Sequence, residues 1–176
     1  KGRLVGSFET NSIFYVEDTK SGAITPQDNF GSNNYLKLDY YHGKFSAGIQ
    51  GEAYMPVLQG YPTDLTKVAL TNYYAQWVDD SFSVTAGTFY EQFGSGLLFR
   101  SWEDRTLGLN NALVGARATY SFGDFVDAKV LWGIPRLGTG VGEDEFFGFG
   151  LTKTWLGGAD VSVSLADIIG LDDMLL

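Results

Sequence analysis

The amino-acid sequence predicts an all-β protein: an antiparallel transmembrane β-barrel, of which this chain supplies the amino-terminal strands. Three observations predict this fold. Three tight hairpins each place apolar and aromatic side chains on one face and polar or charged ones on the other. Short turns alternate with long connections along the chain, and no soluble core is evident between the hairpins. An apolar outside, a charged inside and tight turns on one side are the pattern of a barrel that crosses a membrane.

The composition supports one domain, expected to span residues 1–176 as a single, incomplete β-barrel domain of about nine strands. Aromatic residues make up 15% of the chain and glycines number 23, which is typical of proteins with many strands and frequent bends. A mean hydropathy of −0.05 fits strands whose side chains alternate between apolar and polar. No apolar run approaches the roughly 18 residues that a membrane-spanning helix needs.

Charge and cysteine content exclude several classes of partner. The net charge of −9 disfavours a nucleic-acid partner, because such proteins present basic surfaces to phosphates. The chain has no cysteine, so a disulfide framework and a thiolate metal site are both excluded. Acidic residues cluster in expected turns and loops, where solvation explains them.

The clearest hairpin runs from Asn34 to Tyr54, with His42-Gly43 as the predicted two-residue turn. On the apolar face this register pairs Tyr40 with Phe45, Leu38 with Ala47, and Leu36 with Ile49. The opposite face carries the polar set Tyr35, Lys37, Asp39, Ser46, Gln50 and Glu52. Because the side-chain period of a strand is two, a single register assigns every residue of the hairpin to either the apolar or the polar face.

Two further hairpins repeat the pattern. Around Asp79-Asp80 the predicted apolar pairs are Trp77 with Phe82, Ala75 with Val84, and Tyr73 with Ala86. Around the three-residue loop Gly123–Phe125 they are Phe122 with Val126, Tyr120 with Ala128, Ala118 with Val130, and Ala116 with Trp132. A wrong register would scramble the faces, so three agreeing hairpins favour the barrel. A soluble antiparallel sandwich also alternates and stays open as an alternative.

The predicted strands are Arg3–Val16, Asn34–Tyr41, Lys44–Tyr54, Lys67–Val78, Ser81–Phe89, Asn111–Phe122, Val126–Gly133, Glu145–Trp155 and Asp160–Ala166. Long connections are expected over 17–33, 55–66, 90–110 and 134–144. Short turns are expected at His42-Gly43, Asp79-Asp80, Gly123–Phe125 and Gly157-Gly158. In outer-membrane barrels the short turns are periplasmic and the long loops face outward.

Aromatic side chains gather beside the short turns. Residues predicted to lie at the membrane interface are Tyr40, Phe45, Trp77, Phe82, Tyr120 and Phe122. A ring of amphipathic aromatics at that level is the girdle expected of a membrane barrel. Cross-strand packing in a soluble sheet explains the pairs as well, but not their concentration at the level of the turns.

The predicted strand count is nine, whereas bacterial single-chain barrels normally have an even number. An unclosed sheet in lipid leaves a row of unsatisfied backbone groups, each costing several kcal/mol. Either the count is off by one or the chain is the front portion of a larger barrel, and the second interpretation is favoured.

Four stretches resemble a family of Bacteroidota outer-membrane proteins known only as a domain of unknown function. They are Gly31–Tyr40, Glu52–Pro62, Gly87–Arg105 and Gly157–Leu165, and the third is the most specific. The resemblance implies a barrel, located in the bacterial outer membrane, in proteins considerably longer than this chain. It implies no reaction and no site residues.

The segment Glu91–Arg105 is the least strand-like long stretch. One hypothesis is a loop that folds inward and narrows the lumen, with Glu91, Arg100, Glu103 and Arg105 meeting charges of the barrel wall. Irregular backbone at membrane depth is tolerated only where protein or water satisfies it. The other hypothesis is an extracellular loop held by ordinary arginine–carboxylate pairs.

Five charged residues on the polar strand faces are predicted to face the lumen: Lys37, Asp39, Glu52, Arg117 and Lys129. They either line a channel or form a structural network that fills a small barrel. Because both signs of charge are interspersed, the network is the favoured interpretation.

No catalytic residues are predicted. The single histidine, His42, sits at a tight turn, so a serine–histidine–aspartate arrangement has no base. That also disfavours a hydrolase embedded in the barrel. No EF-hand spacing and no phosphate loop is present, so no metal site and no cofactor are expected.

The predicted function is therefore non-enzymatic. The chain is expected to act as a structural component of an envelope assembly or as a passage for transport or export. Its expected partners are outer-membrane lipid and other envelope proteins. The alternative from a different class is a soluble or surface β-sandwich that binds carbohydrate through exposed aromatics.

Overall fold

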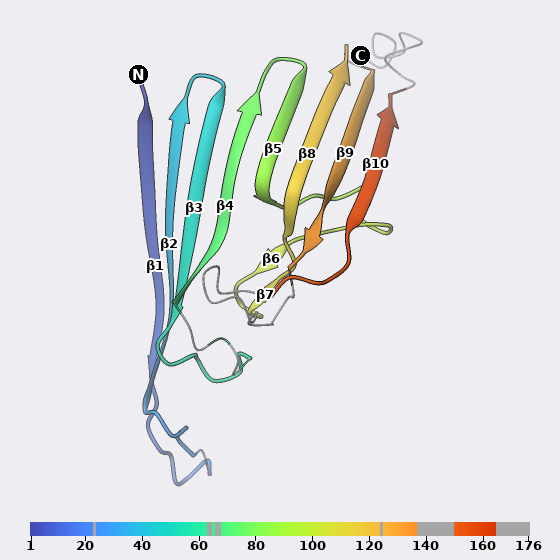
Figure 1. The fold of residues 1–176 in the computed structure, drawn as a ribbon. Coiled ribbons are helices and arrows are strands. Elements are labelled where there is room, and N and C mark those ends of the chain that lie inside the picture. Colours follow the sequence, from blue (N-terminus) through green and yellow to red (C-terminus); the bar gives the residue numbers. More distant parts are fainter. Residues whose placement is uncertain (23, 63–64, 66–67, 124, 137–149, 165–176) are drawn as a thin grey trace, which may run out of the picture.

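The computed structural model of the chain describes residues 1–22, 24–62, 65, 68–123, 125–136 and 150–164. These residues form one main antiparallel sheet, and the prediction of an all-β antiparallel protein is confirmed (Figure 1). Its strands are β1 (Arg3–Phe14), β2 (Phe30–His42), β3 (Phe45–Tyr54), β4 (Val68–Val78), β5 (Phe82–Phe89), β8 (Leu113–Phe122), β9 (Val126–Pro135) and β10 (Leu156–Val163). The two-residue strands β6 (Glu103–Asp104) and β7 (Leu109–Asn110) pair with each other apart from it.

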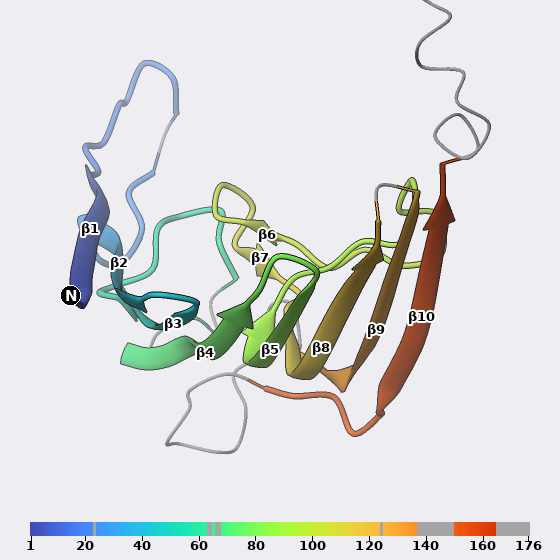
Figure 2. The ribbon, with the colours of Figure 1, turned by 90° about the horizontal axis from the view of Figure 1, so that it is seen from above.

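The main sheet is a meander in the order β1-β2-β3-β4-β5-β8-β9-β10. Short turns join β2 to β3, β4 to β5 and β8 to β9, all at the upper edge in Figure 1, and the long connections leave the opposite edge. The predicted alternation is therefore confirmed for these three short turns, whereas the fourth short turn, predicted at Gly157-Gly158, is not formed. Within the described residues β1 and β10 are the two edges and do not pair with each other, so the sheet is an open arc (Figure 2).

The predicted register of the β8–β9 hairpin is confirmed, with Phe122 opposite Val126 and Ala116 opposite Trp132. In the β2–β3 hairpin the prediction is wrong by two residues, because Leu38 lies opposite Ile49 instead of Ala47. The turn residues are Gly43-Lys44, one position later than predicted.

Backbone sterics explain the position of this turn. Gly43 has φ +58°, and no described residue other than glycine has a positive φ. A two-residue turn with glycine at its first central position is a type II′ turn, which matches the twist of the strands. The predicted turn would have needed His42 in the left-handed region, which costs about 1–2 kcal/mol.

The β4–β5 hairpin has the same two-residue correction. Trp77 lies opposite Val84, whereas the prediction paired it with Phe82. The Asp79 backbone amide bonds to the Phe82 carbonyl oxygen at 2.7 Å, so the turn is Asp80-Ser81. A two-residue change in pairing leaves every side chain on its predicted face, since the strand period is two.

The carboxyl-terminal strands differ from the prediction. Gly157 and Gly158 do not form a turn; they lie inside β10, opposite Trp132 and Leu131. A Cβ at position 158 would lie 2.6 Å from the ring of Phe93, so packing explains this glycine.

The predicted strand over 145–155 also requires correction. Its first five residues, 145–149, are outside the described residues, and the described part, 150–155, contains only an isolated bridge between Leu151 and Arg136. The described main sheet therefore has eight strands, whereas the sequence predicted about nine.

The two faces of the arc differ in polarity. The convex face carries exposed apolar side chains, including Leu4 (70% exposed), Phe8 (66%) and Val161 (63%). The concave face holds most of the charged and amide residues of the strands, together with a small buried apolar cluster formed by Phe89, Leu113 and Leu131. Among the described residues no helix has the length and apolar character to cross a bilayer.

Candidate functional site

The connection between β5 and β8, residues 90–112, folds back over the concave face, and we call it the inner loop. Figure 2 shows its strands β6 and β7 within the arc of the main sheet. The first part of the inner loop closes on itself, because the Ser101 amide bonds to the Glu91 carbonyl oxygen at 2.8 Å. The Phe93 amide bonds to the Phe99 carbonyl oxygen at 3.0 Å. The inner loop is thus an ordered hairpin-like segment lying against the sheet.

Glu91 ties the start of the inner loop to β8 and β9. Its two carboxylate oxygens accept hydrogen bonds from Arg117 at 3.0 Å and from Lys129 at 3.2 Å. Burial alone would raise the pKa of Glu91, but the Gln92 backbone amide and these two cations together lower it. The Arg117 guanidinium also donates to the Thr85 hydroxyl at 3.2 Å, so it bridges the loop and the sheet.

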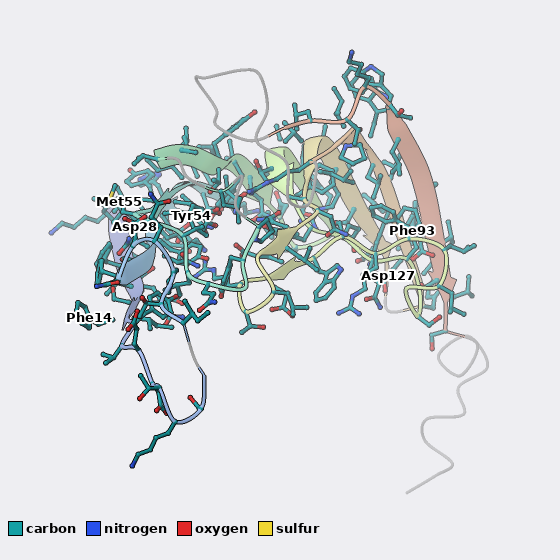
Figure 3. All side chains as sticks on the ribbon, turned by 90° about the horizontal axis from the view of Figure 1, so that it is seen from below. Phe14, Asp28, Tyr54, Met55, Phe93 and Asp127 are labelled. Carbon is teal, nitrogen blue, oxygen red and sulfur yellow. The ribbon has the colours of Figure 1, made fainter. Side chains whose placement is uncertain are left out.

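An apolar contact reinforces this anchor. Phe93 and Phe99 of the inner loop pack against the buried cluster on the concave face, with their ring centroids 5.3 Å apart. Figure 3 shows Phe93 next to β10, where Gly158 leaves room for its ring. The hydrophobic effect therefore favours the same loop position as the ion pairs.

Arg105 anchors the second part of the inner loop. Its guanidinium donates to the Glu9 carboxylate on β1 at 2.6 Å, to the side-chain amide oxygen of Gln50 at 3.2 Å and to the Glu103 carboxylate at 3.4 Å. The guanidinium also lies 4.5 Å from the ring centre of Tyr35, a cation–π contact. One loop residue thereby connects β1, β2 and β3.

A buried pair lies beside this anchor. Arg136 approaches the Glu52 carboxylate at 3.7 Å, and their side chains are only 5% and 3% exposed. Glu52 also accepts hydrogen bonds from the Tyr54 hydroxyl at 2.9 Å and from the Gln50 amide at 3.2 Å. These extra donors matter because a buried charge is costly unless it is paired and hydrogen-bonded.

All five residues predicted to face the lumen lie on the concave face: Lys37, Asp39, Glu52, Arg117 and Lys129. Lys37 and Asp39 are 3.4 Å apart on β2. Asp39 also accepts a hydrogen bond from the Tyr74 hydroxyl at 2.9 Å. Gly48, directly opposite Asp39, has no side chain to block the Tyr74 ring from reaching it.

The four residues proposed for a constriction separate into two groups. Glu91, Glu103 and Arg105 contact residues of the sheet strands. Arg100 is exposed and lies 5.1 Å from the Trp102 ring centre; within the described part of the chain it forms no ion pair.

The network also contains residues that were not among the predicted site residues. They are Glu9, Gln50, Tyr54, Tyr90 and Arg136. Arg136 follows β9 and had been assigned to a long connection, so nothing in the strand pattern marked it. Tyr90 accepts a hydrogen bond from Asn110 at 2.8 Å, and burial together with Glu103 raises the pKa of Tyr90 to about 12.

A cavity of about 350 Å³ lies between β3, β4, β5, β8 and the inner loop. Its wall includes the amides of Gln50, Asn72 and Gln76 and the rings of Tyr74 and Tyr90. Within the described residues, no group of three His, Cys, Asp or Glu side chains is arranged to hold a metal ion.

The six aromatics predicted to lie at a membrane interface are all on the convex face near the short turns: Tyr40, Phe45, Trp77, Phe82, Tyr120 and Phe122. Their side chains are between 37% and 53% exposed. Neighbouring rings contact one another; the ring centroids of Tyr120 and Phe122, for example, are 4.3 Å apart.

The chain was compared with known protein families, curated proteins and solved structures. Residues 1–176 match a family described as a family of unknown function (DUF6029). The chain belongs to this family. No curated protein and no solved structure matches the chain. The DUF6029 match confirms the predicted resemblance to a family of unknown function, and its description names no activity, ligand or partner.

Proposed function

We propose that this DUF6029 chain is the amino-terminal part of a β-barrel that spans the outer membrane of Bacteroidota, and that it has no catalytic activity. The observation that carries the proposal is the convex face, where apolar side chains remain exposed along the strands while charges collect on the concave face. In water such a continuous apolar surface is unfavourable and marks an interaction site. Lipid is the partner that accepts an apolar surface of this extent without shape matching.

The level of the aromatics supports lipid as the partner. Tyr40, Trp77 and Tyr120 lie beside the short turns and are between 40% and 45% exposed. Tryptophan and tyrosine collect where hydrocarbon meets headgroups, because their rings are apolar and carry a polar atom. The short turns would then be periplasmic and the long connections would face outward.

The open edges support the proposal of a larger barrel. Each edge strand of a sheet carries unpaired backbone N–H and C=O groups, and in hydrocarbon each one costs several kcal/mol. A barrel removes this cost by closing. We therefore propose that further strands pair with β1 and β10 and complete the wall.

The inner loop favours one of the two roles proposed for the barrel. Ion pairs from Glu91 and Arg105 anchor the first and the second half of the loop, respectively. Packing of Phe93 and Phe99 reinforces the anchor of the first half. A loop fixed at several points inside the arc favours a narrowed lumen, and hence a structural component of an envelope assembly whose long outer connections meet other envelope proteins. The polar concave wall favours a passage as the second candidate.

Extraction from the native outer membrane tests the membrane proposal. We expect the full-length protein to require detergent and to migrate differently on a gel before and after heating, because closed barrels resist unfolding by detergent alone. Protein that remains soluble without detergent and shows no heat-dependent shift would overturn the proposal and favour the soluble carbohydrate-binding sandwich.

Planar-bilayer conductance separates a structural barrel from a passage. The wild-type full-length protein is compared with a double variant, Glu91→Ala and Arg105→Ala, which removes the ion-pair anchors of both halves of the loop. We expect little conductance from the wild type and a clear increase in the variant if the loop narrows a lumen. Steady conductance by the wild type, unchanged in the variant, would instead indicate an open passage that the loop does not control.

A further inference from the structure

The inner loop carries two adjacent leucines that nothing in the described part of the chain covers. Leu97 and Leu98 are 92% and 94% exposed, and every other large apolar side chain among the described residues is more buried. Single exposed apolar residues are ordinary on protein surfaces. Two neighbouring leucines that are both almost fully open to solvent indicate that another surface meets them.

Residues 93–99, which we call the loop tip, form an ordered turn. The Phe93 amide bonds to the Phe99 carbonyl oxygen at 3.0 Å, and the Gly96 amide bonds to the Phe93 carbonyl oxygen at 2.9 Å. Gly94 and Gly96 have φ values of +51° and +85°, a conformation that glycine adopts without steric cost. The turn therefore presents the two leucines in a fixed position.

The base of the loop tip lies at the open edge of the sheet. A Cβ at position 158 on β10 would lie 2.6 Å from the Phe93 ring, and β10 is an edge strand of the described sheet. Figures 1 and 2 show the inner loop, drawn in yellow-green, running across the sheet to β10. Gly158 lies opposite Leu131 of the buried concave cluster, so the loop tip is on the concave side and faces away from the proposed lipid surface.

The loop tip is long enough to reach past β10. Residues 94–98 turn back at their middle, so the tip advances about two residues from its base. An extended residue spans at most about 3.3–3.6 Å, which gives about 7 Å for two. A strand paired with β10 would lie about 4.8 Å beyond it. The leucines are therefore within reach of the first strand that continues the wall.

The chemistry of the loop tip limits what can cover it. Its sequence, Phe-Gly-Ser-Gly-Leu-Leu-Phe, contains no charged residue. Phe93 and Phe99 already pack against the apolar cluster of the concave face, and the two leucines extend this contact toward the open edge. A polar or charged wall opposite the leucines would leave them without a favourable contact, whereas an apolar one removes their surface from water.

We propose that Leu97 and Leu98 dock against apolar side chains on the inward face of the strand that pairs with β10. The inference rests on the proposed barrel, because it requires that strand. The inner loop is then fixed to the wall on both sides of β10, by the Glu91 ion pairs at its base and by the leucines at its tip. It spans part of the lumen as a strut held at both ends.

Photo-crosslinking of the full-length protein in native outer-membrane vesicles tests this contact. Leu98 is replaced by the photoreactive residue p-benzoylphenylalanine, and the crosslinked peptides are identified by mass spectrometry after irradiation. We expect a crosslink within one chain, from position 98 to a peptide that follows β10 in the sequence. The same replacement of Leu97 serves if the first prevents folding.

Leu107 provides the matched control. It belongs to the second part of the same loop and is 57% exposed, and the same replacement there should not crosslink to that peptide. Leu97→Ser/Leu98→Ser should also lower the temperature at which the heat-dependent gel shift occurs, by about 5 °C or more, because an apolar contact is lost. Leu107→Ser should leave that temperature nearly unchanged.

The heat-dependent shift separates this inference from the proposed barrel. A wild-type protein without the shift would overturn the barrel and the docking contact together. A wild-type protein that shows the shift, but crosslinks from position 98 only to β10 and earlier residues or to a second polypeptide, overturns the contact and leaves the barrel standing. Equal temperature changes in the leucine double variant and in Leu107→Ser would likewise contradict the contact.

Discussion

Glu91 anchors the first part of the inner loop to the main sheet. It faces two cations from neighbouring strands, Arg117 and Lys129, and its side chain is 10% exposed. Removing one partner of a largely buried pair leaves the other charge uncompensated, which costs more than the pair contributes. The structure therefore concentrates the electrostatic anchoring of the first part of the inner loop in one carboxylate.

The depressed pKa of Glu91 predicts a pH dependence. A carboxylate whose folded pKa lies below its unfolded value, here 4.5, stabilises the fold above that value. The stabilisation is lost as the pH falls through the folded pKa. At pH 7, Glu91→Gln should reduce the free energy of unfolding by about 1–3 kcal/mol. The urea midpoint should fall accordingly. The difference from the wild type should narrow steadily as the pH falls below about 4.5.

Urea titrations from pH 7 to pH 3 in lipid vesicles measure this difference. Glu17→Gln, in the exposed connection after β1, is the control and should follow the wild type throughout. A gap between Glu91→Gln and the wild type that stays constant at every pH would show that the carboxylate charge is not the source of the stabilisation.

The close packing around Gly115 leads to a second prediction at the scale of one residue. It lies opposite Gly87 on β5 and Gly133 on β9, and an added Cβ would collide with the Trp132 carbonyl oxygen. Backbone atoms cannot move aside as a flexible side chain can. Gly115→Ala should therefore destabilise the protein by about 1–3 kcal/mol.

Gly157→Ala is the matched comparison for this glycine. It is in the same sheet, but its Cβ would meet Trp132 at an ordinary 3.5 Å. Equilibrium unfolding in urea should show a large loss of unfolding free energy for Gly115→Ala and a small loss for Gly157→Ala. Equal midpoints for the two variants would mean that the strands have room at Gly115.

At the scale of the elements, alternation was enough to predict the faces but not the pairing. Leu38, Ala47 and Ile49 all lie on the predicted face although the register is displaced by two residues. The error in the register came from the turn. The positive φ of Gly43 fixes which two residues form the turn, and the alternation of the strands does not indicate this. Where the loop length was predicted correctly, at Gly123–Phe125, the register was also correct.

Contacts between distant segments explain the remaining errors. Gly157-Gly158 resembles a turn locally, but Phe93 from the inner loop packs where a side chain would otherwise lie. The ion pair between Arg105 and Glu9 joins residues 96 positions apart, and no local pattern can indicate such a partner. The sequence could therefore suggest charged residues for the site, while the choice of partners required the three-dimensional fold.

Cysteine pairs can verify the register of the β2–β3 hairpin, since the chain has no cysteine of its own. The double variant Tyr41→Cys/Ser46→Cys places the thiols directly opposite each other and should oxidise readily. Tyr41→Cys/Lys44→Cys matches the register expected from a His42-Gly43 turn and should oxidise poorly. Maleimide labelling after mild oxidation measures the free thiols. Faster loss of thiols in the second pair would contradict the observed register.

At the scale of the whole molecule, the polarity of the arc is reversed relative to a soluble sheet. The concave side holds buried charges such as Glu52 and Arg136, and the convex side exposes residues such as Trp132 and Val130 at 54% each. In a soluble protein this arrangement places the hydrophobic effect in opposition to folding. In a bilayer the same arrangement is favourable, because lipid becomes the solvent of the convex face.

If the convex face lies in a bilayer, as proposed, the cost of a charge on it depends on depth, which no soluble sheet shows. Val130 lies four residues along β9 from Val126, on the same face, and Val126 adjoins the short turn after Phe122. In a membrane, Val130→Arg should destabilise the barrel by about 2–4 kcal/mol, since it places a charge towards the middle of the hydrocarbon. Val126→Arg should cost only about 0–1 kcal/mol, because its guanidinium reaches the interface. Urea unfolding of the full-length protein in vesicles measures both values. On a face exposed to water both substitutions would remain within about 0.5 kcal/mol of the wild type, so equal and small effects would contradict insertion into a bilayer.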